Sequence, residues 1–260
     1  MKTLDNFYTD GEYLKNNPTW DSEDAPWKAK QLFDLLNKSN IEIQNIKTVS
    51  EVGCGSGEVL INFAKLINRK EKKTPLTPLY QREEESQAKE DLKYIGYDLS
   101  PDAINIADKN KTKYKLENNF EFKIMSVPDE KSNILICADV FEHIEDEFTF
   151  LRNIKGKSEY FLFNIPLDLS VQSMMREHVV LAQRKRVGHV NYYTRSLALE
   201  TLRDTGYEII DYTFGPWYKH VAHNSLSTKF INVIRNMLMP IAPEFCVQYF
   251  GGSSLVVLAK

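Results

Sequence analysis

The sequence has few cysteines and no closely spaced pair of them. Cys54, Cys137 and Cys246 are the three cysteines in 260 residues, and no CxxC occurs. An odd, widely spaced set argues against a disulfide framework and against a cysteine-rich metal site. The sequence therefore predicts a reducing setting, the cytoplasm.

Long apolar runs and a basic excess are also missing. No segment approaches the roughly 20 apolar residues of a membrane span, and the first residues, MKTLDNFYTDGEY, carry acids where a secretion signal needs a basic end. The net charge is −3, and the basic tract that stands out, QRKR at 183–186, is short. We therefore expect a small-molecule substrate, no membrane partner and little affinity for nucleic acid.

What the sequence does contain is an alternation of strand and helix patterns. Hydrophobic residues make up 42% of the chain, enough for a substantial core. The alternation predicts an α/β fold with a doubly wound, mostly parallel, seven-stranded sheet, N-terminal helices and a helical insertion before the last strand. The predicted strands span residues 48–52, 94–98, 120–125, 133–139, 160–165, 207–214 and 254–259.

A glycine-rich turn, VSEVGCGSGE at 49–58, joins the first predicted strand to a helix. Gly53, Gly55 and Gly57 let backbone amides approach a ligand at the helix N-terminus. A phosphate is disfavoured there, because the turn lacks the lysine ending of a P-loop, has GxGxG spacing instead of GxGxxG, and follows the acidic Glu51. S-adenosylmethionine carries an ammonium, a sulfonium and a carboxylate but no phosphate, so it suits this turn better.

Asp98 stands at the end of the second predicted strand, where a carboxylate can accept both ribose hydroxyl protons. It follows Gly57 by 41 positions, whereas fingerprints of this kind place the acid about 20 residues on. Removing the polar, proline-interrupted segment 70–91 restores the expected spacing. Asp98 is therefore the predicted ribose ligand.

Four segments, EVGCGSGE, YIGYDLSPDAINIA, ICADVFEHIED and GYEIIDYTF, together resemble the class I S-adenosylmethionine-dependent methyltransferases. The resemblance covers roughly residues 45–215 and the last strand. It implies S-adenosylmethionine as cofactor, S-adenosylhomocysteine as product, and methyl transfer to an oxygen or nitrogen atom of a small molecule. It implies cofactor contacts at Glu51, Gly53, Cys54, Gly55, Gly57, Asp98, Leu99, Ser126, Val127, Ala138 and Asp139. The acid that many members carry beside the adenine, near Met125 or Ser126, is absent here.

Two histidines are the candidates for proton transfer. If the acceptor is a hydroxyl, its proton must leave, and histidine is the side chain best suited to take it near neutral pH. His143 follows the fourth predicted strand and His189 the fifth, so either can act as a base or contact the substrate. The alternatives are a structural hydrogen bond for His143 and a loop role for His189. Tyr192 and Tyr193 are expected to line the acceptor pocket or to pack beside the helix that follows.

A similarity to two methyltransferase subfamilies raises a metal alternative. In the small-RNA 2′-O-methyltransferases and the ubiquinone-pathway O-methyltransferases, acids and histidines in this neighbourhood hold a divalent metal. The similarity maps Asp139, Glu142, His143 and His189 as ligands of Mg, Mn or Zn, the first three on one face if their segment is helical. Asp139 is shorter than the glutamate often found there, and DVxEH also occurs in relatives without metal. The sequence therefore favours no metal.

The chain divides into two predicted parts. Residues 1–47 form an N-terminal helical cap, whose Trp20 and Trp27 either cover the cofactor or anchor a helix. Residues 48–260 form the methyltransferase domain, with a mobile insertion at 70–91 and an inserted helical wall at 217–250.

Three other functions are compatible with the sequence. A metal-dependent RNA 2′-O-methyltransferase follows from the metal similarity but gains nothing from the net charge. A nicotinamide-dependent oxidoreductase can use a similar sheet, although the spacing of the glycines and Glu51 weigh against it. A non-catalytic cofactor-binding protein is the third, because a pocket does not prove turnover.

Overall fold

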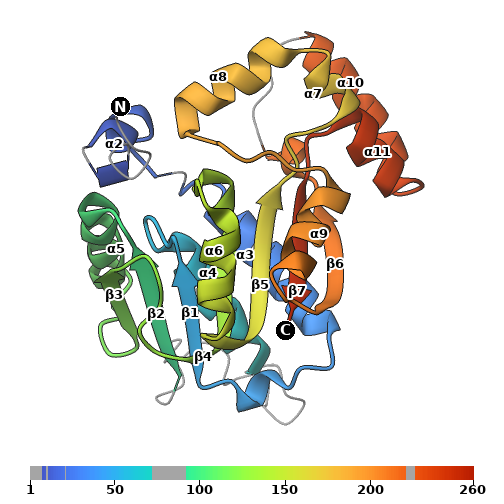
Figure 1. Ribbon diagram of the computed structural model, residues 1–260. Coiled ribbons are helices and arrows are strands. Elements are labelled where there is room, and N and C mark those ends of the chain that lie inside the picture. The colour runs from blue at the N-terminus through green and yellow to red at the C-terminus, as the bar shows by residue number, and fades with distance from the viewer. Residues whose placement is uncertain (1–7, 10, 21, 72–91, 221–225) are drawn as a thin grey trace, which may run out of the picture.

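A seven-stranded sheet forms the centre of the molecule (Figure 1). The structure is a computed structural model that describes residues 8–9, 11–20, 22–71, 92–220 and 226–260. Strand order is β3-β2-β1-β4-β5-β7-β6. The strands are β1 (Thr48–Val52), β2 (Lys93–Asp98), β3 (Phe120–Ile124), β4 (Ser132–Ala138), β5 (Ser158–Pro166), β6 (Ile209–Gly215) and β7 (Ser254–Ala259). All pairings among β1 to β5 are parallel, whereas β7 runs antiparallel to both β5 and β6. The predicted fold class is confirmed.

Helices cover both faces of the sheet, as a doubly wound fold requires. One core cluster packs α3, α4 and α5 against alternate strand residues such as Val49 and Ile134, and the other packs α6 and α9 against their neighbours, such as Val52 and Leu135. The helices are α2 (Glu12–Asn16), α3 (Ala25–Lys38), α4 (Glu58–Glu71), α5 (Pro101–Lys113), α6 (Glu147–Lys155), α7 (Val171–Met174), α8 (Glu177–Val187), α9 (Arg195–Asp204), α10 (Leu226–Leu238) and α11 (Pro243–Phe250), with short 3₁₀ turns η1 (Ile43–Asn45), η3 (Phe141–His143) and η4 (Trp217–Lys219).

Helices α5 and α3 differ in how their N-termini are capped. Ser100 caps α5, since its hydroxyl accepts a hydrogen bond from the Ala103 amide and Pro101 follows in the first turn. Asp24 occupies the N-cap position of α3, with Pro26 in the first turn, but its side chain makes no cap hydrogen bond. The Asp24 carboxylate instead pairs with Lys28 at 3.0 Å. The Asp24 side chain therefore pairs with a residue one turn further along α3 and, like Lys28, lines the cavity described below.

Two predicted insertions interrupt the alternation of strands and helices in the sequence. The polar insertion begins within α4, and its residues 72–91 lie outside the described residues. The predicted wall at 217–250 contains η4, α10 and α11. Figure 1 shows α7, α8, α10 and α11 together at the top of the molecule, beyond the carboxyl end of β5. In the described part of the chain, no helix is both long and apolar enough to cross a membrane. The division into a cap and a methyltransferase domain stays a prediction.

Candidate functional site

A cavity of about 520 Å³ opens at the carboxyl ends of the central strands. Its floor comes from the glycine turn after β1 and from the end of β4, and helices α7, α8 and α10 contribute its upper wall. Open α/β sheets bind ligands at this edge, where the strand order reverses. Five of the predicted cofactor contacts other than Asp139 line the cavity: Glu51, Gly53, Cys54, Gly55 and Ala138.

Asp98 ties the glycine turn to the end of β2. The Gly55 amide donates to one Asp98 carboxylate oxygen at 2.8 Å, and the Ser100 amide donates to the other at 2.8 Å. Burial raises the pKa of Asp98, and these backbone hydrogen bonds oppose the rise. The two predicted halves of the cofactor site therefore meet, because the carboxyl ends of neighbouring parallel strands lie at one edge.

Glu51 lies beneath the same turn. Its side chain is buried and accepts a hydrogen bond from the Leu60 amide, in the first turn of α4, at 3.1 Å. Burial raises the pKa of Glu51 well above its usual range. A cationic ligand in the cavity would favour the carboxylate form.

Trp20 lies directly over the glycine turn. Gly55 has φ of +51°, and a Cβ built on it would lie 2.5 Å from the Trp20 ring, so only glycine fits beneath the indole. Tyr13 supports the indole from the other side, with ring centroids 4.7 Å apart. Trp27 is largely buried and packs on the His220 ring at 4.9 Å, and it also contributes to the cavity lining. Trp20 thus covers the turn, whereas Trp27 anchors α3.

Some predicted cofactor contacts lie outside the cavity. Gly57 faces the core, since a Cβ there would meet the Phe122 ring at 2.7 Å, so its role is packing. Leu99 and Ser126 are exposed and Val127 is half-buried at the carboxyl ends of β2 and β3. The Met125 amide donates to the Asp98 carbonyl at 2.9 Å, which holds these two strand ends together. They form an open shelf beside Asp98.

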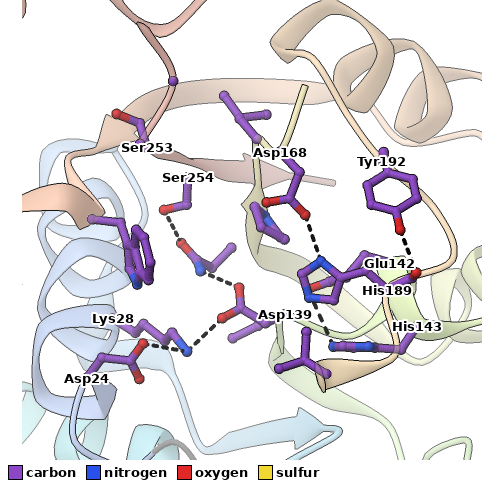
Figure 2. A pocket seen from close by; sticks show the side chains of 18 of the residues that line it. Asp24, Lys28, Asp139, Glu142, His143, Asp168, His189, Tyr192, Ser253 and Ser254 are labelled. Atoms are coloured by element: carbon purple, nitrogen blue, oxygen red, sulfur yellow. Dashed lines mark hydrogen bonds and ion pairs between the residues drawn. The ribbon is translucent and has the colours of Figure 1, made fainter. Parts of the chain in front are cut away.

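Asp139 belongs to a polar chain that sequence reasoning missed (Figure 2). Its carboxylate pairs with Lys28 at 2.6 Å and accepts from the Asn164 amide at 2.6 Å, and Asn164 in turn accepts from the Ser254 hydroxyl at 2.8 Å. Burial opposes the charge of Lys28, but Asp139 and Asp24 raise the pKa of Lys28 above its usual value. The signal available in the sequence was a lysine four residues after Asp24, within an apolar stripe.

The ion pair between Lys28 and Asp139 is expected to stabilise the folded protein. Lys28→Ala should lower the free energy of unfolding by about 3 kcal/mol, because it leaves the Asp139 carboxylate without its cation. The matched control is Lys30→Ala on the same helix, which breaks an exposed pair with Asp34 and should cost less than about 1 kcal/mol. Urea unfolding measures both, and equal costs would contradict a structural role for Lys28.

Glu142, His143 and His189 form a second cluster deeper in the cavity. One ligand atom from each lies within 4.8 Å of the others. Glu142 is fully buried, and neither of its carboxylate oxygens has a hydrogen-bond partner among the residues that the structure describes, although His143 Nε2 lies 3.8 Å from Glu142 Oε1. Burial, followed by the charge of Asp139, raises the pKa of Glu142 well above its usual range. Buried polar atoms without partners are rare and point to an absent ligand or proton.

Asp139 does not join this cluster. The prediction assumed that residues 139–143 are helical and share one face, but they are not: Asp139 has φ of +54°, and only the 3₁₀ turn η3 follows. The left-handed backbone turns the Asp139 side chain towards Lys28. The expected set of four is therefore a set of three.

Both histidines are oriented through Nδ1. His189 donates Nδ1–H to Asp168 at 2.6 Å. Tyr8 donates its one proton to the Val187 carbonyl at 2.8 Å, so His143 donates Nδ1–H to the Tyr8 oxygen at 2.7 Å. Each ring is left with an Nε2 lone pair, able to accept a proton or bind a metal. Burial and the neighbouring His189 lower the pKa of His143 to about 3, which keeps that ring neutral.

The orienting residues Asp168 and Tyr8 were not predicted. Asp168 follows the end of β5 by two residues, a position where a polar residue can reach the ligand-binding edge of the sheet. Tyr8 reaches His143 from 135 positions away, and nothing local signals such a contact.

The two predicted substrate tyrosines separate. Tyr192 lines the cavity, and its hydroxyl donates to the His189 carbonyl at 3.0 Å. Tyr193 is 4% exposed and packs edge-on against Phe141, with ring centroids 5.2 Å apart. The prediction of Tyr193 as a pocket residue is wrong, because consecutive residues of this extended segment face opposite sides.

This fold and site define a class of protein. A sheet of this order, a glycine turn after β1 and an acid at the end of β2 are the features of the class I S-adenosylmethionine-dependent methyltransferases. A methyltransferase domain family matches residues 25–212, most of the chain. The chain belongs to this methyltransferase family.

Solved structures with the same fold cover almost the whole chain. Magnesium protoporphyrin IX methyltransferase from Synechocystis, solved with S-adenosylhomocysteine bound, is 12% identical with a TM-score of 0.56, covering 98% of this chain and 96% of its own. A cyclopropane synthase from Mycobacterium tuberculosis is 14% identical with a TM-score of 0.55, covering 88% and 82%. No curated protein matches.

Proposed function

We propose that this protein transfers the methyl group of S-adenosylmethionine to a hydroxyl oxygen of a small-molecule acceptor bound in the cavity. The observation that carries the proposal is His189, which lines the cavity and whose Nδ1 is fixed by Asp168, so that Nε2 is the nitrogen that can accept a proton. An amine acceptor would have less need of such a base, so the pair favours oxygen over nitrogen.

The cofactor would bind along the glycine turn. The Asp98 carboxylate would accept the ribose hydroxyls, with the adenine on the shelf formed by Leu99, Ser126 and Val127, and with its amino acid end near Glu51. The 2.8 Å hydrogen bond between Gly55 and Asp98 supports this placement, since it sets the turn beside the acid. Trp20 would cover the bound cofactor and exclude water.

The reaction is a displacement at carbon. The acceptor oxygen attacks the methyl carbon, the carbon–sulfur bond breaks, and S-adenosylhomocysteine leaves with the electron pair. The hydroxyl proton passes to His189 Nε2, and Asp168 stabilises the imidazolium that forms. His143, with a pKa of about 3, is too weak a base for this step at neutral pH. Of the two functional roles predicted for His143, base and substrate contact, we therefore propose substrate contact.

Transfer of labelled methyl groups tests the proposal. The full chain is incubated with methyl-labelled S-adenosylmethionine and panels of small phenols, carboxylic acids, sugars and amines. We expect label in hydroxyl-bearing acceptors and its loss in His189→Asn. Label that enters only amines, or transfer that survives His189→Asn unchanged, would refute oxygen transfer by this base.

A second candidate is a metal-dependent form of the same reaction. The buried Glu142 oxygens, which accept no hydrogen bond from the described residues, favour it, and a carboxylate with two imidazoles is a donor set that suits Zn, Mn or Fe. Glu142, His143 and His189 would hold the ion, which when bound would polarise the acceptor oxygen. No comparable observation in the described residues favours an RNA 2′-O-methyltransferase, a nicotinamide-dependent oxidoreductase or a non-catalytic cofactor-binding protein.

Titration with Mn²⁺ separates the two candidates. In the metal-dependent case, chelator-treated protein binds one Mn²⁺ per chain by calorimetry, and Glu142→Gln weakens binding at least about tenfold because the negative charge of the carboxylate ligand is lost. Glu145→Gln, an exposed acid on the same segment, is the matched control and should change nothing. Absence of binding to the wild-type protein would remove the metal candidate and leave His189 as the base.

A further inference from the structure

Large apolar side chains gather on the outer helices above the cavity. Of the 18 large hydrophobic residues that are exposed in the described chain, 12 lie between residues 171–181 or 226–249. Monomeric soluble proteins rarely expose so concentrated an apolar surface without a use for it. The 12 are Val171, Met174, Met175, Val179, Leu181, Leu226, Phe230, Val233, Met237, Ile241, Phe245 and Tyr249.

Helix α10 turns an apolar stripe outward. Leu226, Phe230, Val233 and Met237 recur at helical spacing and are 84%, 68%, 56% and 67% exposed. A surface helix of a globular protein ordinarily buries such a stripe against the core. Arg235, on the other face, is the residue of α10 that is buried, and it donates to the Phe250 carbonyl. The apolar face of α10 is therefore left exposed by the part of the chain that the structure describes.

The same helices carry a positive charge that the rest of the chain does not. Residues 171–187 and 226–249 contain six basic side chains and two acidic side chains, whereas the remaining sequence contains 27 basic and 34 acidic. Lys185 and Lys229 are exposed on α8 and α10, and Arg176 and Arg186 are exposed at the rim of the cavity, which they also line. Apolar side chains rimmed by lysine and arginine are the pattern of helices that lie in the interface of an anionic membrane.

The apolar, basic surface is continuous with the cavity. Val180 of α8, together with Thr228 and Ile231 of α10, lines the cavity, and Val179 belongs both to the exposed set and to the cavity lining. Figure 1 shows α7, α8 and α10 at one end of the molecule. A partner that covers their outer faces would therefore lie beside the cavity.

We infer that the outer faces of α7, α8 and α10 form an interfacial surface that docks on a lipid bilayer with anionic headgroups. The apolar stripe enters the boundary of the acyl chains, while the basic side chains contact the headgroups. The lack of a spanning helix, from which the sequence predicted no membrane partner, does not bear on a helix that lies in the interface. The inference goes beyond the proposed function, since docking requires no turnover.

Two other partners fit the surface less well. A second copy of the chain, packed face to face, would bring the same basic side chains together and repel itself. A nucleic acid would pair with the basic side chains but leave the stripe of α10 in water. Anionic lipid satisfies both the charge and the apolar area.

Vesicle sedimentation of the full chain tests the inference. We expect partition into vesicles of phosphatidylcholine and phosphatidylglycerol, at least about tenfold weaker with phosphatidylcholine alone. The double variant Phe230→Ser with Met237→Ser should lose binding by about 10²-fold, since two apolar anchors are removed. Lys185→Gln with Lys229→Gln should lose about tenfold. The matched controls, Leu197→Ser with Ile210→Ser and Lys109→Gln with Lys131→Gln, alter exposed residues elsewhere and should bind like wild type.

Several results would overturn the inference. One is that wild type does not bind vesicles of phosphatidylcholine and phosphatidylglycerol. Another is that the Phe230→Ser and Met237→Ser double variant binds them as strongly as wild type does. A dimer in analytical ultracentrifugation that Phe230→Ser dissolves, without vesicle binding, would assign the surface to a second copy. RNA binding that depends on Lys185 and Lys229, again without vesicle binding, would assign it to nucleic acid. Calorimetry with S-adenosylhomocysteine on the same variants reports folding and tests the proposed function separately.

Discussion

Replacing His189 with asparagine is expected to lower kcat for a hydroxyl acceptor by about 10²–10⁴-fold, the usual contribution of a positioned base. Asparagine keeps a polar side chain of similar size but has no lone pair basic enough to take the proton. Affinity for S-adenosylhomocysteine should not change, because Asp98 and the glycine turn are untouched. Initial rates with labelled methyl donor, alongside calorimetry with the product, measure both quantities.

Asp168→Asn separates positioning from proton transfer. Asp168 acts through His189, so its loss should lower kcat and shift the pH–rate profile, while leaving the cofactor affinity intact. His178→Asn, an exposed histidine on α8, is the control and should react like wild type. A His189→Asn enzyme with unchanged kcat would show that positioning of the acceptor alone is sufficient.

Replacing Asp98 with alanine is expected to weaken S-adenosylhomocysteine binding by about 10²-fold. The substitution removes the acceptor of two backbone hydrogen bonds and the proposed ligand of the ribose, and each hydrogen bond to a charged group is worth about 1.5–3 kcal/mol. Asp102→Ala changes an acid four residues on, in the first turn of α5, and is the matched control. Calorimetry measures both, and less than about a threefold difference between them would contradict the placement of the ribose.

The strands of the fold could be predicted because each has a local signature. Every predicted strand lies within two residues of the observed one, since apolar runs bounded by turn residues depend on neighbours in sequence. The meeting of Asp98 with the glycine turn could also be predicted, because parallel strands bring their carboxyl ends together. These inferences need only the order of elements and no side-chain detail.

The contacts around the histidines could not be predicted in the same way. The orientation of Asp139 depends on one left-handed backbone angle, and a sequence pattern does not reveal it. Lys28 and Tyr8 come from N-terminal segments whose path over the sheet is set by packing. Tyr193 faces the core and Tyr192 the cavity, a difference of one residue in register. The local sequence pattern therefore predicts which segments contain the site, whereas tertiary packing determines which of their side chains line it.

The position of β7 has a consequence for biosynthesis. β7 follows β6 in the chain but lies between β5 and β6, and it supplies the pairing partner of both. Until residues 254–259 have emerged from the ribosome, the apolar β5 therefore has an open edge, and β6 has no neighbour. A nascent chain in this state exposes strand edges that can pair with other chains. Pairing of β7 with β5 and β6 is therefore the step that protects the nascent protein from this route of aggregation.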